Sequence, residues 1–123
     1  MSIKLGSHLA FLGVDDIAAA RTFYEETLGL PFVTDEMGTL VFDLNGTQLR
    51  ISQVEGFRPQ TFTVLGWLVE DITAETAKLA AAGIEPVRYP GLPHDEHGIA
   101  ALGSVRILWF ADPAGNVLSL TGS

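Results

Sequence analysis

The chain has 123 residues, of which 47% are hydrophobic and 18% charged, a composition typical of one folded domain and not of a disordered chain. Seven basic against fifteen acidic residues give a net charge of −8 without any Lys or Arg cluster, which argues against nucleic-acid binding. The absence of cysteine excludes disulfides, thiol nucleophiles and cysteine metal sites. The apolar stretch near the N-terminus is too short for a signal peptide or a membrane span, so we expect a cytoplasmic protein without membrane contact.

The clearest feature along the chain is an internal repeat. The letters VDDI at residues 14–17 return as VEDI at residues 69–72. Both motifs place an acidic residue where a helix N-cap is expected, and apolar residues then recur at helical spacing. The two patterns end at Gly29 and Gly83, as helices do at a C-cap glycine. The sequence therefore predicts two related helices. Thr76 is a polar residue at one of the positions where the second helix is expected to be apolar.

Strand patterns surround both helices. Apolar runs of strand length precede them, and an extended piece and two further strands follow each one. The expected strands are residues 8–14, 31–36, 39–44 and 47–54 in the first half, and 62–69, 85–90, 104–110 and 116–122 in the second. Asn45-Gly46 predicts a tight hairpin turn, and residues 112–115 form its longer counterpart. Each half therefore reads β-α-β-β-β.

The two halves are joined by a short segment, residues 55–60. A half with a single helix covers only one face of its sheet, so the other face needs a partner. We therefore expect an α+β fold in which two pseudo-symmetric β-α-β-β-β modules, residues 5–55 and 61–121, pair curved mixed sheets around a cleft. On this interpretation residues 1–123 form a single domain.

The repeated helix motif, the closing FADPAGNVLSL at residues 110–120 and the paired β-α-β-β-β units resemble the vicinal oxygen chelate superfamily. This superfamily includes glyoxalases, extradiol dioxygenases, epimerases and bleomycin-resistance proteins. The resemblance covers nearly the whole chain, and it implies two curved sheets around a cleft, often in a homodimer. In its metal-dependent members, His, Gln or Glu at four strand positions hold a divalent ion that is chelated by two vicinal substrate oxygens.

The resemblance places these four ligand positions at Leu9, Arg50, Val64 and Ser119. None of the four is a good metal ligand, and Arg50 puts a permanent cation where the ion would sit. We therefore expect no metal and no other cofactor, and a cleft that takes a small-molecule ligand. The residues expected to line this cleft are Leu9, Phe11, Arg50, Ser52, Val64, Trp109 and Ser119.

Arg50 and Trp109 leave alternatives open at this point. Arg50 either binds a ligand carboxylate or phosphate in the cleft, or reaches solvent, or pairs with an acidic neighbour such as Glu55. Trp67 falls on the helix side by alternation, whereas the face of Trp109 is not fixed by the sequence.

Residues 89–103 form an expected loop that is rich in titratable side chains. His94, Glu96 and His97 lie there among prolines and glycines, so we interpret the segment as a lid or ligand-contact loop, with an ordinary polar surface loop as the alternative. A displaced metal site would have to be built from residues such as His8, His94, Glu96 or His97.

Two functions of different classes remain. One is metal-free binding of a small organic ligand, like that of the bleomycin-resistance proteins, which sequester a cationic drug in the clefts of an acidic dimer. The net charge of −8 supports this hypothesis, whereas the positive charge of Arg50 in the cleft opposes it. The other is a glyoxalase- or dioxygenase-type metalloenzyme with lyase, isomerase or ring-cleaving activity and a non-standard metal site. Metal-free catalysis, with Arg50 stabilising an oxyanion, is a third interpretation. No catalytic residue is identified from the sequence.

Overall fold

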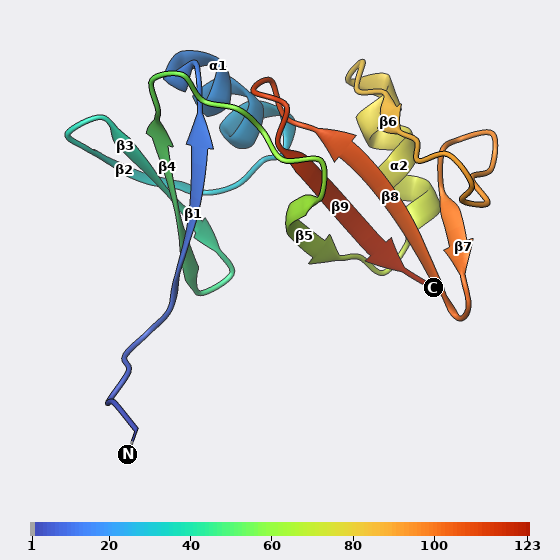
Figure 1. Cartoon of the computed structure of the whole chain (residues 1–123), viewed down its shortest axis with the longest axis horizontal. Coiled ribbons are helices and arrows are strands. Elements are labelled where there is room, and N and C mark those ends of the chain that lie inside the picture. The colour runs from blue at the N-terminus through green and yellow to red at the C-terminus, as the bar shows by residue number, and fades with distance from the viewer. Residues whose placement is uncertain (1) are drawn as a thin grey trace. The chain divides into compact units, whose positions relative to one another are not determined.

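Each half of the sequence folds into a unit of one sheet and one helical layer (Figure 1). The computed structural model describes residues 2–123, and the chain divides between Phe57 and Arg58 into two compact units. We call them unit 1 and unit 2 and describe each by itself.

Unit 1 contains four strands and one helical segment. Its elements are β1 (Leu9–Val14), α1 (Ile17–Arg21) with a π-helical continuation (Thr22–Thr27), β2 (Phe32–Glu36), β3 (Thr39–Leu44) and β4 (Thr47–Gln53). The sheet order is β1-β4-β3-β2, with β1 parallel to β4 and the other pairs antiparallel. The first strand of the unit thus lies beside its last.

Unit 2 repeats this order with one addition. Its elements are β5 (Thr63–Leu68), α2 (Ile72–Ala81), β6 (Pro86–Val87), β7 (Ala100–Leu102), β8 (Val105–Ala111) and β9 (Val117–Gly122). The order β5-β9-β8-β6 matches that of unit 1, with β5 parallel to β9, and β7 pairs with β8. The predicted strand at residues 85–90 is reduced to two residues, and β7 arises within the expected loop.

The helices begin where the acidic motifs predict. The side chains of Asp16 and Asp71 accept hydrogen bonds from the backbone N–H three residues on, at 3.1 and 3.0 Å, and so cap α1 and α2. Gly29 and Gly83 follow the helices with φ of 72° and 81°, a conformation that L side chains rarely adopt. The caps and stops of both predicted helices are confirmed.

The first helix departs from regular α-helical geometry after Arg21. The N–H of Leu28 donates to the carbonyl of Phe23 at 2.9 Å, a bond that spans one residue more than in an α-helix. This wider turn carries two consecutive buried aromatic residues, Phe23 and Tyr24, whose rings meet edge to face at 5.1 Å.

The core of each unit lies between its helix and one face of its sheet. In unit 1, Tyr24 packs on Phe42 with ring centroids 6.2 Å apart, and Leu49 and Ile51 are fully buried. In unit 2, Ile72, Phe110 and Leu118 are buried in the same layer.

The α+β class and the two curved mixed sheets, of four and five strands, are thereby confirmed. The pairing of the two modules around a cleft, within one domain, stays a prediction. In residues 2–123, no helix has the length and apolar character needed to span a membrane.

Candidate functional site

In each unit, one face of the sheet packs against the helix, and we call the opposite face the open face. In unit 1, Leu9 and Phe11 project from β1 onto the open face, where their register partners on β4 are Gln48 and Arg50. Both apolar side chains are solvent-accessible, Leu9 at 49% and Phe11 at 66% of its surface. The open face of unit 1 therefore presents an apolar strand beside a polar one.

Arg50 is held in place on this face by two neighbours. One guanidinium nitrogen donates a short hydrogen bond to Glu36 Oε2, and the other donates to Gln48 Oε1 at 3.3 Å. Of the alternatives open for Arg50, ion pairing is the one observed, but the partner is Glu36 on β2 and not Glu55. Ser52, next to it on β4, shares a hydroxyl hydrogen bond of 3.0 Å with Thr39. The charge of Arg50 is thus compensated on the open face itself.

The open face of unit 2 is centred on Ser119 in β9. Its register partners are Gly66 on β5 and Trp109 on β8. A Cβ at position 66 would collide with the Ser119 hydroxyl oxygen, so the glycine leaves the room that this hydroxyl occupies. Val64 lies at an irregularity of β5, where the register shifts between Thr63 and Leu65.

The pairing with Ser119 also fixes the orientation of Trp109. Its neighbours Leu108 and Phe110 lie on the helix side, so the indole lies on the open face. Its Nε1–H donates to Thr63 Oγ1 at 3.1 Å, and its ring meets Tyr89 edge to face at 5.1 Å. Tyr89 was not among the residues singled out from the sequence.

His94 joins this aromatic group, with its ring 5.9 Å from that of Trp109. Its Nε2 accepts the backbone N–H of Tyr89 at 3.0 Å, so Nδ1 carries the proton and donates to the carbonyl of Gly98 at 2.8 Å. Both ring nitrogens are therefore committed to backbone groups. In this arrangement His94 shapes the loop and has no lone pair for a metal ion.

The loop that follows is organised around Asp95. One of its carboxylate oxygens accepts the backbone N–H of both His97 and Ile99, each at 2.9 Å. Arg88 donates to the carbonyls of Asp95 and Glu96 at 3.0 and 3.1 Å. Sequence reasoning assigned no role to either residue, although an Asp three residues before a Gly is a turn pattern that could have found Asp95.

The three residues of the expected lid are not brought together. His94 faces Trp109 on the open side, whereas His97 lines a pocket on the helix side. Glu96 and His97 form an exposed pair 3.5 Å apart. The function of the loop as a lid stays a prediction.

The residues at the four ligand positions do not fit a divalent ion. Leu9 and Val64 have no donor atom, Arg50 is a paired cation, and Ser119 offers one hydroxyl. Elsewhere, His8 shares a 2.9 Å hydrogen bond with Thr47, and residues 2–123 contain no group of three or more His, Asp or Glu side chains that could hold a metal. The side chains at these four positions therefore provide no ligand set for a divalent ion.

Both units have the β-α-β-β-β order with parallel first and last strands, and this defines the class of the protein as a vicinal oxygen chelate fold. The family model of the Glyoxalase/Bleomycin resistance protein/Dioxygenase superfamily matches residues 6–120. The chain belongs to this superfamily.

Solved structures with the same fold include three bacterial proteins. The chain is similar to a glyoxalase/bleomycin resistance protein from Streptomyces sp. CB03234, with 25% identity, a TM-score of 0.68 and coverage of 94% of this chain and 98% of the other. It is also similar to a glyoxalase family protein from Enterococcus faecalis, with 24% identity, a TM-score of 0.71 and coverage of 98% and 99%. The fosfomycin resistance protein FosX from Listeria monocytogenes gives 14% identity, a TM-score of 0.77 and coverage of 98% and 95%. No curated protein matches the chain in sequence.

Proposed function

We propose that this protein binds a small organic ligand through the open faces of its sheets, without a metal ion, in the manner of a sequestering bleomycin-resistance protein. The observation that carries the proposal is the set of side chains at Leu9, Arg50, Val64 and Ser119, which offers no carboxylate, amide or imidazole to an ion. A ligand on either open face is bound by contacts with protein atoms alone.

The open faces have the chemistry of an organic ligand site. Leu9 and Phe11 expose apolar surface in unit 1, and Trp109 stands against Tyr89 in unit 2. Aromatic and aliphatic walls with a few fixed polar groups are typical of small-molecule sites. The hydroxyls of Ser52 and Ser119 supply such polar groups on the two faces.

The charges on these faces support a neutral or cationic ligand. Arg50 alone would repel a cation, but its ion pair with Glu36 compensates that charge. The net charge of −8 attracts cations to the protein as a whole. The Streptomyces protein described as a glyoxalase/bleomycin resistance protein carries the same fold. We therefore take a cationic drug, metal-free bleomycin, as the first ligand to test, on a protein that we expect to be a homodimer.

Isothermal titration calorimetry with metal-free bleomycin in excess EDTA tests this proposal. Saturable binding with the drug recovered unchanged is the expected result. Phe11→Ala should weaken binding about tenfold, since it removes the most exposed aromatic ring of the open face. Met37→Ala, a fully exposed apolar side chain in the β2–β3 turn, is the matched control and should bind as the parent does. Absence of saturable binding would overturn the sequestration proposal.

Metal analysis of the purified protein tests the metal-free part separately. Hydrogen bonds occupy one imidazole nitrogen of His8 and both of His94, and residues 2–123 contain no group of three His, Asp or Glu side chains that could hold a displaced metal. Stoichiometric metal in the protein as purified, lost in a His94→Ala/His97→Ala double variant, would contradict the proposal and establish the metalloenzyme interpretation.

A further inference from the structure

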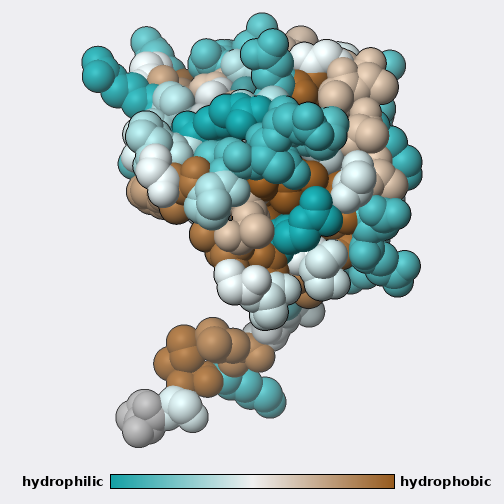
Figure 2. Space-filling view, turned by 90° about the vertical axis from the view of Figure 1, so that its right-hand side faces the viewer, coloured by the Kyte–Doolittle hydropathy of each residue, from teal (hydrophilic) through white to brown (hydrophobic). Residues whose placement is uncertain are grey.

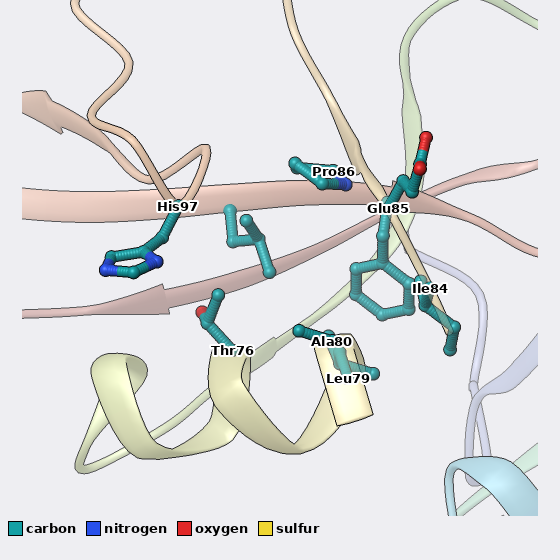
Figure 3. A pocket seen from close by; sticks show the side chains of 9 residues that line it. Thr76, Leu79, Ala80, Ile84, Glu85, Pro86 and His97 are labelled. Atoms are coloured by element: carbon teal, nitrogen blue, oxygen red, sulfur yellow. The ribbon is translucent and has the colours of Figure 1, made fainter. Parts of the chain in front are cut away.

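Unit 2 contains a pocket on the side of its sheet that faces α2, and Figure 3 shows the inner part of this pocket. It lies between α2 and the segment that runs from β6 through the Asp95 turn. Its outer part has a volume of about 370 Å³, within the range of small-molecule sites. A small inner recess, which reaches Leu108 and Phe110, adjoins it. The two parts share the lining residues Thr76, Ala80, Pro86 and His97.

The lining of the pocket is largely apolar. Ala77 and Ala80 on α2 form one wall, and Pro86 and Ile99 form the other. Figure 2, which looks onto the side of the molecule at the right of Figure 1, shows hydrophobic surface hollowed between hydrophilic side chains. Such a surface accepts the apolar body of a ligand.

Thr76 places an unpaired polar atom in this apolar lining. The residue is only 6% exposed, and its Oγ1 is buried without a hydrogen-bond partner among residues 2–123. In Figure 3 the hydroxyl lies on the side of the pocket toward His97. A buried hydroxyl without a partner is unfavourable, and a ligand oxygen in the pocket would satisfy it.

Arg88 places an uncompensated positive charge at the mouth of the pocket. Its guanidinium donates to two backbone carbonyls, and among residues 2–123 no ion pair involves it. Arg106, by comparison, has the Asp95 carboxylate 4.0 Å away. Glu96 also lines the mouth, where its highly exposed side chain lies 3.5 Å from the His97 ring. An arginine with N–H groups to spare suits a carboxylate.

From these observations we propose that the helix-side pocket binds a small apolar monocarboxylic acid. The hydrocarbon body packs on Ala77, Ala80 and the neighbouring apolar side chains, and the carboxylate pairs with Arg88 while the Thr76 hydroxyl donates to a ligand oxygen. This site is independent of the function proposed above, because it lies on the opposite face of the unit 2 sheet from Trp109.

Titration of the ¹⁵N-labelled protein with hexanoate, followed by amide chemical shifts, tests the proposal. We expect saturable shifts at Thr76, Ala80 and His97, and no shift of the Trp109 indole N–H. Hexan-1-ol, which has the same chain but no charge, is the matched ligand and should bind about tenfold more weakly, because it loses the pairing with Arg88.

Two variants of α2 assign the binding to the pocket. Ala80→Leu fills it and should abolish the hexanoate shifts, whereas Ala81→Leu adds the same side chain to an exposed position outside the lining and should leave them unchanged. Thr76→Val keeps the shape of the side chain without its hydroxyl, and should weaken hexanoate binding about tenfold.

Three results would overturn the proposal. They are the absence of saturable shifts with hexanoate, equal affinity for hexanoate and hexan-1-ol, and hexanoate binding by Ala80→Leu equal to that of Ala81→Leu. Shifts confined to the Trp109 indole would place the acid on the open face and would also contradict it. None of these results bears on the bleomycin titration, so the two proposals fail separately.

Discussion

The helical layers of the two units follow one plan but are filled differently. In unit 1 the Arg21 guanidinium lies 4.0 Å above the ring of Phe32, and that ring meets Phe42 edge to face at 5.5 Å. The layer is closed by these stacked side chains together with the π-helical turn that carries Phe23 and Tyr24.

Unit 2 has smaller side chains at the two corresponding places. The repeat offset puts Thr76 where unit 1 has Arg21, and the sheet register puts Pro86 opposite Phe110 as Phe32 is opposite Phe42. The pocket opens beside these two residues. A repeated fold can therefore gain a cavity by losing side-chain volume at two positions while its backbone plan is kept.

The largest effect that this comparison predicts is in unit 1. Phe42→Ala should lower the free energy of unfolding by about 3–5 kcal/mol, because it removes a fully buried ring from a filled layer. Denaturant-induced unfolding measures this loss. Phe62→Ala, at a phenylalanine that is largely exposed, is the control and should cost far less. Similar losses for both variants would mean that the layer of unit 1 is not filled as described.

A gain in stability is expected at the corresponding layer of unit 2. Thr76→Val should raise the free energy of unfolding by about 1–3 kcal/mol, because it removes a buried hydroxyl that has no partner. Thr73→Val, where the hydroxyl accepts a 3.2 Å hydrogen bond from Arg106, should give no such gain. Destabilisation by Thr76→Val in the same unfolding experiment would show that this hydroxyl is satisfied in the folded protein.

Substitutions at the two helix N-caps test whether the two units lose the same stability where their structures agree. Asp16→Ala and Asp71→Ala should each cost about 1 kcal/mol, because each removes one side-chain bond to a helix N–H. The corresponding Asp→Asn variants, which keep an acceptor, should cost less. A single unfolding transition that shifts equally in both variants is expected, and a marked inequality would break the equivalence of the two helix starts.

The smallest expected effect concerns the stacked arginine. Arg21→Thr gives unit 1 the residue that unit 2 has at the corresponding position, Thr76. It should lower the free energy of unfolding by about 0.5–1 kcal/mol, mainly through the lost contact with the Phe32 ring. The exposed pair of Arg21 with Glu25 adds little to this. Raising the salt concentration should leave most of the loss in place, whereas a loss that disappears in salt would assign it to the ion pair.

Local signals in the sequence predicted the frame of both units correctly. The acidic caps Asp16 and Asp71 are formed by side chains within a turn of their targets, and Asn45 and Gly46 both adopt the positive φ that their hairpin needs, so neighbouring residues suffice to define them. Strand alternation likewise placed Leu9 and Phe11 on one face and Trp67 on the other side of its sheet.

Two of the remaining features depend on residues that are distant in sequence. The ion pair of Arg50 joins it to Glu36 on β2, across the sheet, and not to Glu55, which is nearer along the chain. The hairpin of β7 with β8 is local, but β7 is only three residues long and lies in a segment whose prolines and glycines predict a loop. The helix-side pocket forms because the side chains beside it are too small to fill the layer, and no sequence motif indicates such a gap. The one trace in the sequence was Thr76, a polar residue at a core position of a helical stripe.

The parallel pairing of first and last strands has a consequence for the order of folding. In unit 1 Gly13 pairs with Ser52, and in unit 2 Gly66 pairs with Ser119, so each sheet is completed by closing a loop of about 40 or 50 residues. The entropic cost of closing these two loops differs by only about 0.3 kcal/mol, so loop length gives neither unit a kinetic advantage. Apart from β6 and β8, which the loop and β7 separate, the antiparallel strands of each unit join through short connections, and the strand synthesised first in each unit is expected to dock last.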